Sequence, residues 1–100
     1  MHTRVVLIKL KETWSQHSKA QEFAEASEKK LSTVPGVVSC NGTLPSDNET
    51  KGAWDVCLFL TFEKPDDVES YKIHPIHQSY LKDDLIPKME AKKVWNFHSV

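Results

Sequence analysis

Four segments of the chain carry the apolar patterns that are typical of β-strands. The longest, residues 53–62 (AWDVCLFLTF), is rich in β-branched and aromatic residues. The first, residues 4–10 (RVVLIKL), is short and almost wholly apolar, as in a strand that is covered on both faces. Altogether we predict strands at residues 4–10, 37–44, 53–62 and 93–98.

Between the first two strands, apolar and small residues recur every three or four positions, which predicts an amphipathic helix. Ser18 and Gln21 match a capping box at its start, and Pro35 and Gly36 follow its end. Charged residues take the opposite side of this helix. Its inner side is predicted to consist of Ala20, Phe23, Ala24, Ser27, Leu31 and Val34.

A second helical segment begins near residue 64 and ends near residue 85. His74 and Pro75 interrupt it, because proline fits the first turn of a new helix but not the interior of a continuing one. Residues 45–52 are polar and are predicted to form a loop. No repeat or linker divides the chain, so we expect one domain over residues 1–100.

The order strand, helix, strand, strand, helix, strand predicts an α+β fold of the ferredoxin-like βαββαβ type. Its four-stranded antiparallel sheet would carry both helices on one face. The strands are nevertheless apolar on both faces, since Val5 and Leu7 alternate with the inner residues of the first strand and Cys57 and Phe59 do so in the third. An apolar face open to water needs a cover. We predict a homodimer that pairs two sheets face to face, the alternative being a monomer with a moderately apolar face.

Composition excludes several classes of protein. With 39% hydrophobic and 27% charged residues the chain can form a core, and a net charge of −1 without a basic segment argues against nucleic-acid binding and adsorption to anionic lipid. The apolar run Val5–Ile8 is too short for a signal peptide, and no stretch approaches the length of a membrane span. Two cysteines are too few for a disulfide framework. We expect a cytoplasmic protein without nucleic-acid or membrane partners.

Three segments carry specific residues that periodicity alone does not explain: the opening RVVLIKLK, the turn VPGVV at residues 34–38, and YKIHPIH at residues 71–77. On these, and on the closing VWNF, the chain resembles the stress-responsive dimeric α/β-barrel family over nearly its whole length. The resemblance implies ferredoxin-like units paired into a barrel. Many members are stress-linked proteins, and one plant branch is a polyketide cyclase that forms olivetolic acid from a poly-β-keto chain.

Similarity to that branch implies His77 as the general base and Tyr71 as its supporting hydroxyl. The first-strand histidine of the branch corresponds to Arg4 here, and the first-helix tyrosine to Ser27, so half of the set is absent. We therefore expect a stress-responsive barrel protein that is not a cyclase. The alternative is an enzyme or binder of a small aromatic or β-keto compound, with His77 as acid and base.

The residues themselves leave two roles open at each position. His77 titrates near neutral pH and could move a proton, or it could cap the helix through a bond to the backbone. Tyr71 could orient a substrate oxygen or fill the core. Arg4 shares a face with apolar residues and could bind a substrate carboxylate or pair with a carboxylate such as Asp55.

The remaining candidates concern the walls of a pocket. Trp14 could lie over its mouth or fill the core or the dimer interface. Ser27 and Tyr80 would set its size.

His74 and His77 stand three apart without further ligands, so we predict neither a metal site nor a cofactor. Cys40 and Cys57 would be neighbours if their strands pair as a hairpin. They have no cationic neighbours in sequence, which favours buried, inert thiols.

Overall fold

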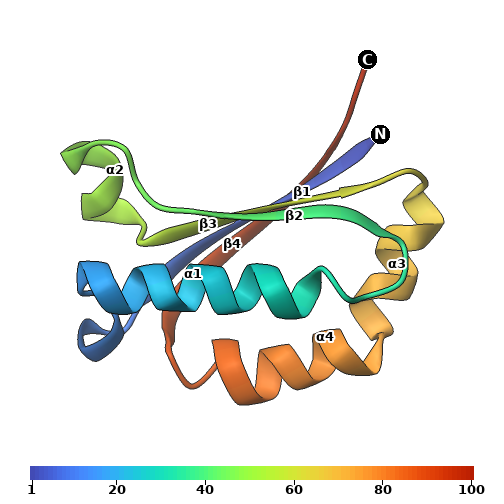
Figure 1. Cartoon of the computed structure of the whole chain (residues 1–100). Coiled ribbons are helices and arrows are strands. Elements are labelled where there is room, and N and C mark those ends of the chain that lie inside the picture. The colour runs from blue at the N-terminus through green and yellow to red at the C-terminus, as the bar shows by residue number, and fades with distance from the viewer.

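The four strands form where the apolar runs predict them, and the computed structural model describes all 100 residues of the chain (Figure 1). The strands are β1 (His2–Leu10), β2 (Val37–Thr43), β3 (Val56–Phe62) and β4 (Met89–His98). The helices are α1 (His17–Leu31), α2 (Asn48–Ala53), α3 (Pro65–Ile73) and α4 (Pro75–Ser79), with a 3-10 turn η1 (Glu12–Trp14) and a π-type segment η2 (Tyr80–Leu85). None of the helices has the length and apolar character needed to cross a bilayer.

The sheet has the order β2-β3-β1-β4, and every neighbouring pair is antiparallel. Helices α1 and α4 lie on the same face of this sheet, while α2 and α3 lie at its opposite ends (Figure 1). The two termini lie side by side, because His2 is paired with His98. The ferredoxin-like βαββαβ arrangement predicted from the sequence is therefore confirmed.

The core lies between α1 and the inner face of the sheet. Ile8, Leu60 and Phe62 point toward the helices and are fully buried, and Phe23 and Leu31 of α1 pack in the same cluster. Period-two alternation along β1 and β3 thus assigned the inner residues correctly.

Helix α1 approaches β2 closely. The backbone N–H of Gly42 donates to Glu28 Oε2 of α1 at 2.8 Å. A Cβ atom at Gly42 would stand 2.4 Å from the carbonyl oxygen of Ala24, so only glycine fits between the strand and the helix there.

The main differences from the sequence prediction are an added helix and the starts of β3 and β4. The expected loop at residues 45–52 contains α2, which begins at an N-cap: Asp47 Oδ1 accepts the N–H of Thr50 at 2.7 Å. Because α2 runs to Ala53, β3 starts at Val56 and not at residue 53. Strand β4 starts four residues earlier than predicted because its backbone pairs with β1 from Met89 on, and an edge strand tolerates charged side chains.

The expectation that Cys40 and Cys57 are neighbours is wrong. The β2–β3 register places Leu60 opposite Cys40 and Thr43 opposite Cys57, so the two thiols lie on different faces of the sheet. Both cysteines are free. Burial raises the pKa of the Cys40 thiol to about 12 and also raises the pKa of Cys57, so neither is an activated thiolate.

The outer face of the sheet, which no helix covers, is apolar in its middle. In register across it, Val5 lies between Phe59 of β3 and Trp95 of β4. Phe59 is 38% exposed, Trp95 54% and Phe97 62%. We call this surface the open face; its central residues are Val5, Leu7, Cys57, Phe59, Trp95 and Phe97.

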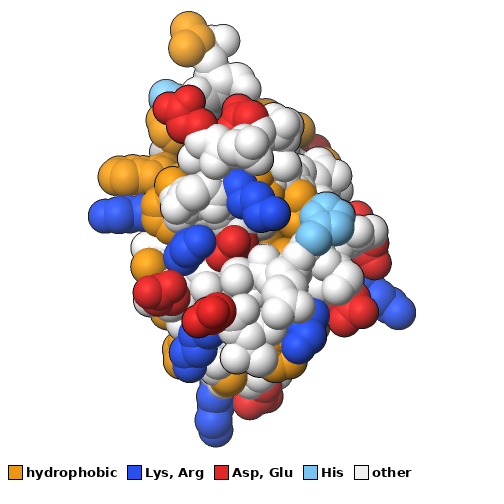
Figure 2. All heavy atoms as spheres, turned by 90° about the vertical axis from the view of Figure 1, so that its left-hand side faces the viewer, with side chains coloured by type: hydrophobic (Ala, Val, Ile, Leu, Met, Phe, Trp, Pro, Cys, Tyr) orange, Lys and Arg blue, Asp and Glu red, His pale blue; other side chains and the backbone are white.

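The end of the molecule that carries α2 and the start of α1 has a different character. Figure 2 shows basic and acidic side chains interspersed over this end, with no large area of one sign. They surround a shallow hollow of about 160 Å³, whose lining includes His17, Lys51 and Asp55. Mixed charge of this kind is typical of an ordinary solvated surface.

Candidate functional site

The chain break at His74 and Pro75 sets up the candidate site. His74 is extended and ends α3, and its Nδ1 accepts the N–H of Ile76 at 3.1 Å, which caps α4. Pro75 occupies the first turn of α4, where its missing N–H costs nothing. His74 is therefore the N-cap of α4.

His77 lies in α4 with only 7% of its surface exposed. Its Nδ1 is 2.9 Å from the carbonyl oxygen of Lys72, and a carbonyl only accepts, so Nδ1 carries the proton. The lone pair is then on Nε2, which has no hydrogen-bond partner in the protein. One ring nitrogen of His77 is therefore structural, as the capping alternative held, and the other is available for chemistry.

The charge state of His77 follows from its surroundings. Burial lowers its pKa, and the positive charges of Arg4 and Lys92 lower it further, against the opposing effect of the Lys72 carbonyl. His77 is therefore neutral at pH 7 and able to accept a proton at Nε2.

Tyr71 of α3 packs directly on His77. The ring centroids are 4.3 Å apart, and on its other side Tyr71 meets Phe62 edge-on at 5.3 Å. Its hydroxyl has no hydrogen-bond partner in the protein, and burial raises its pKa, so it is a neutral donor. The ring of Tyr71 thus fills the core, while its hydroxyl remains free of protein partners.

Arg4 of β1 points inward beside this pair. Its guanidinium lies 5.8 Å from the centre of the Tyr71 ring, and its Nη1 donates to Asn96 Oδ1 at 3.1 Å. Its Nε is buried and has no hydrogen-bond partner. Burial lowers the pKa of Arg4 from its ordinary value, although the group stays charged.

The expected alternative of an Arg4–Asp55 ion pair is not found. Asp55 accepts the N–H of Leu10 at 2.8 Å and lies 3.5 Å from Lys9 Nζ, at the far end of β1. The Leu10 N–H and Lys9 therefore compensate the charge of Asp55, and Arg4 is in no ion pair.

A small cavity joins these groups. It has a volume of about 20 Å³ and lies between the sheet and the segment α3–α4–η2. This is room for about one water molecule. Its polar lining consists of Arg4, Tyr71, His77, Tyr80 and Lys92.

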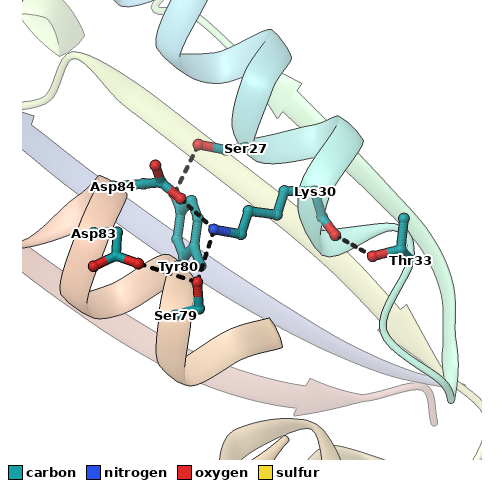
Figure 3. Close-up of polar contacts among 7 residues, drawn as sticks. All are labelled: Ser27, Lys30, Thr33, Ser79, Tyr80, Asp83 and Asp84. Atoms are coloured by element: carbon teal, nitrogen blue, oxygen red, sulfur yellow. Dashed lines mark hydrogen bonds and ion pairs between the residues drawn. The ribbon is translucent and has the colours of Figure 1, made fainter. Parts of the chain in front are cut away.

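Ser27 and Tyr80 bond to one another. Ser27 Oγ of α1 and the Tyr80 hydroxyl of η2 are 2.7 Å apart, and both residues are buried. Figure 3 shows this contact beside Lys30, which reaches from α1 to Ser79 at 3.1 Å and to Asp84 at 2.7 Å. These bonds hold α1 against α4 and η2.

Tyr80 also separates two spaces. It lines the cavity at His77, and with Ser27 and Lys30 it lines a hollow of about 150 Å³ between α1 and η2. The backbone around it is widened, since Ile86 N–H bonds to the carbonyl of Leu81, five residues back. Such π-type turns occur frequently at functional sites.

Trp14 is not part of the cavity. It lies in η1, half-buried, with Lys88 Nζ 4.7 Å and Lys19 Nζ 5.5 Å from its ring. The structure therefore brings Arg4, Tyr71, His77 and Tyr80 together around the cavity. Ser27 is bonded to Tyr80 but does not line the cavity, and Trp14 lies outside it.

Sequence reasoning missed Lys92 and Asn96 of β4. Both lie on the inner side of the strand with Val94, and Asn96 stands opposite Arg4. Alternation from Val94 would have found Lys92 if the strand had been extended toward Met89.

Comparisons with known proteins agree with this architecture. A family model described as the stress responsive A/B barrel domain matches residues 3–92. No curated protein sequence matches the chain significantly.

Three solved structures illustrate the similarity of fold. A ferredoxin-like protein from Mesorhizobium loti superposes with a TM-score of 0.83 at 19% identity, over 99% of this chain and 96% of that one. A protein from Arabidopsis thaliana gives 0.83 at 16% identity, over 100% and 96%. A Bacteroides fragilis protein that is described as dimeric and ferredoxin-like gives 0.74 at 18% identity, over 98% and 95%.

Proposed function

Because the chain belongs to the stress responsive A/B barrel domain family, we propose that residues 1–100 form one domain that acts as a homodimer joined through the open face of its sheet. The observation that carries this proposal is the apolar row Phe59, Val5 and Trp95, which is in register and largely uncovered. Exposed aromatic residues that gather on one face are typical of an interface. Two such faces related by a two-fold axis would close the two sheets into a barrel.

The proposed dimer is a stress-linked protein and not a polyketide cyclase. A cavity of about 20 Å³ has no room for a poly-β-keto chain. Arg4 and Ser27 also stand where the cyclase branch has its histidine and tyrosine. Both observations favour a side-chain-filled interior.

The oligomeric state tests the dimer. Trp95→Asp places a charge in the middle of the open face, and we expect it to convert a dimer of twice 11.4 kDa into a monomer in sedimentation equilibrium. Ile86→Asp is the matched control, because Ile86 is also 54% exposed but lies just after η2, away from the open face. A Trp95→Asp protein that remains dimeric would place the interface elsewhere.

A second candidate function is a small-molecule site at His77, and the free Nε2 favours it. In this function, Nε2 accepts a proton from an acidic C–H or O–H group of a small carbonyl compound. The Tyr71 hydroxyl donates to the carbonyl oxygen, and Arg4 stabilises the negative charge that develops there. Rotation of Tyr80 would join the cavity to the hollow at Ser27 and make room for an aromatic ring. Trp14 remains outside this site.

A thermal-unfolding screen tests this second function at fixed protein concentration. Small neutral ketones, phenols and carboxylic acids are compared on the wild type, on His77→Gln and on the exposed control His17→Gln. A compound at a hundred times its dissociation constant adds about 2.7 kcal/mol, and each kcal/mol shifts the midpoint by roughly 4–8 °C. Shifts that His77→Gln abolishes and His17→Gln keeps support the site, whereas no shift with any compound contradicts it.

We also propose a cytoplasmic location, which the two free thiols favour. Cys40 and Cys57 lie on opposite faces of the sheet, where they cannot bridge one another. Fractionation of cells that express the tagged chain checks the location, and recovery from an oxidising compartment would contradict it.

A further inference from the structure

We propose that the cavity beside Arg4, Tyr71 and His77 binds the carboxylate group of a small organic acid. This inference rests on the second candidate function, the small-molecule site at His77, and names its class of ligand.

Arg4 has an unmet hydrogen bond. Arg4 Nε lies in the interior without a partner, while Nη1 of the same group is held by Asn96. Arg4 is only 9% exposed. A buried donor that is left unpaired is costly, and a carboxylate oxygen in the cavity would accept from it.

The buried guanidinium of Arg4 has no anion in direct contact with it. Three ion pairs exist in the protein, and they use Lys9, Lys30 and Lys72. Neither Arg4 nor Lys92 belongs to one, although both line the same cavity. Glu69 attracts Arg4 without forming an ion pair with it, and water solvates the exposed Lys92. A water molecule could satisfy Nε but would leave the buried guanidinium without an anion in contact, whereas a carboxylate meets both needs.

The size of the cavity limits what can enter it. About 20 Å³ is room for one water-sized group, so one carboxylate oxygen fits there and a ring does not. Lys92 is exposed and Leu81 half-buried, so the cavity approaches the surface between β4 and η2. The rest of the acid molecule would extend to the surface there, past Lys92. The Tyr71 hydroxyl can donate to the same carboxylate oxygen.

Binding of an anion should change the titration of His77. The charged and titratable groups that face it are Arg4 from β1, Lys92 from β4, Tyr71 from α3 and Tyr80 from η2. Burial lowers the pKa of His77, and the two cations lower it further. A bound carboxylate offsets them and accepts a proton held on Nε2, so the pKa of His77 rises when the acid binds.

The test is an NMR titration of the full chain with propionate, with neutral propionamide as the matched probe. We expect propionate to shift the His77 ring resonances and raise its titration midpoint, and propionamide to leave both unchanged. Arg4→Gln and Lys92→Gln should weaken propionate binding at least tenfold. Lys82→Gln, an exposed lysine of η2 outside the cavity, should not change it. Lys92 is exposed, so its variant should fold even if Arg4→Gln does not.

Equal responses to propionate and propionamide, or no response at His77, would overturn the proposal and assign the Arg4 donor to a bound water. Neutral ketones that still bind in the thermal screen in a His77-dependent manner would show that the carboxylate class is wrong while the site exists. If no compound binds in either experiment, the second candidate function fails with it.

Discussion

The inner and outer faces of this sheet are built from similar residues, yet they have different surroundings. On β3, Leu60 and Phe62 point inward and are fully buried, while their neighbour Phe59 points outward and is 38% exposed. The inner face also holds Arg4 Nε, which is shielded from solvent and lacks a hydrogen-bond partner. The comparison indicates that the inner face supplies the stability of the protomer. The proposed small-molecule site lies on this face, and the proposed dimer interface lies on the outer one.

The largest expected effect separates the two faces by stability. Leu60→Ala removes a fully buried side chain and should lower the free energy of unfolding by about 2–5 kcal/mol. Phe59→Ala should cost the protomer much less, because its ring is already partly in water. Urea unfolding of both variants in the Trp95→Asp background, where the protein is expected to be monomeric, measures the difference. Equal losses would contradict the division between faces.

A second prediction concerns the contact of the inner face with α1. Gly42→Ala drives a Cβ atom into the carbonyl of Ala24 and should destabilise the protein by about 1–3 kcal/mol. Gly52→Ala is the matched control, because a Cβ atom at Gly52 meets nothing within 4 Å and α2 gains helix propensity. Thermal unfolding should lower the Tm of the first variant and keep or raise that of the second. A Gly42→Ala protein as stable as the wild type would show that α1 can move away from β2.

A smaller effect is the pH dependence that His77 gives the inner face. The folded-state pKa of His77 lies below the unfolded value of about 6.5. As the pH falls below that value, the unfolded chain takes up the proton first, so stability is lost until the pH passes the lowered folded pKa. Chemical unfolding at pH 7.5, 6.5 and 5.5 should therefore show a steeper loss in the wild type than in His77→Gln. Parallel curves would mean that His77 is not buried in solution.

The smallest expected effect is a difference in thiol labelling between the outer and inner faces of the sheet, which leaves stability unchanged. Cys57 lies on the open face and is half-buried, whereas Cys40 lies under the helices. A thiol reagent should modify Cys57 before Cys40, slowly because burial raises both pKa values. Labelling of Cys57 should be faster in the Trp95→Asp monomer than in the wild type. Mass spectrometry after timed quenching gives both rates, and identical rates would argue that the open face is uncovered in both proteins.

The sequence predicted the topology because each element carries a strong local pattern. Alternation along β3 identified its buried residues, and the Pro35–Gly36 and His74–Pro75 pairs marked real ends of helices. Helix α2 was missed because its six residues, NETKGA, have no apolar periodicity. The early start of β4 was missed because backbone pairing with β1, and not side-chain pattern, decides it.

The site was predictable only in part. Family resemblance pointed to Tyr71 and His77, and the structure brings their rings into contact. The hydrogen-bond partner of Arg4 could not be predicted. Asn96 lies near the other end of the chain and comes beside Arg4 only through the pairing of β1 with β4. The size of the cavity depends on the rotamer of Tyr80 and its bond to Ser27, and spacing in the sequence contains no such information.

The interruption at His74 and Pro75 has a consequence for recognising such sites elsewhere. In one continuous α-helix, residues six apart point about 120° away from each other and lie roughly 9 Å apart along the axis. Tyr71 and His77 meet at 4.3 Å only because the chain changes direction between them. The proline is therefore as much a part of the motif as the two rings. A chain that has the tyrosine and the second histidine but continues its helix through this point would place them on different sides and form no such pair.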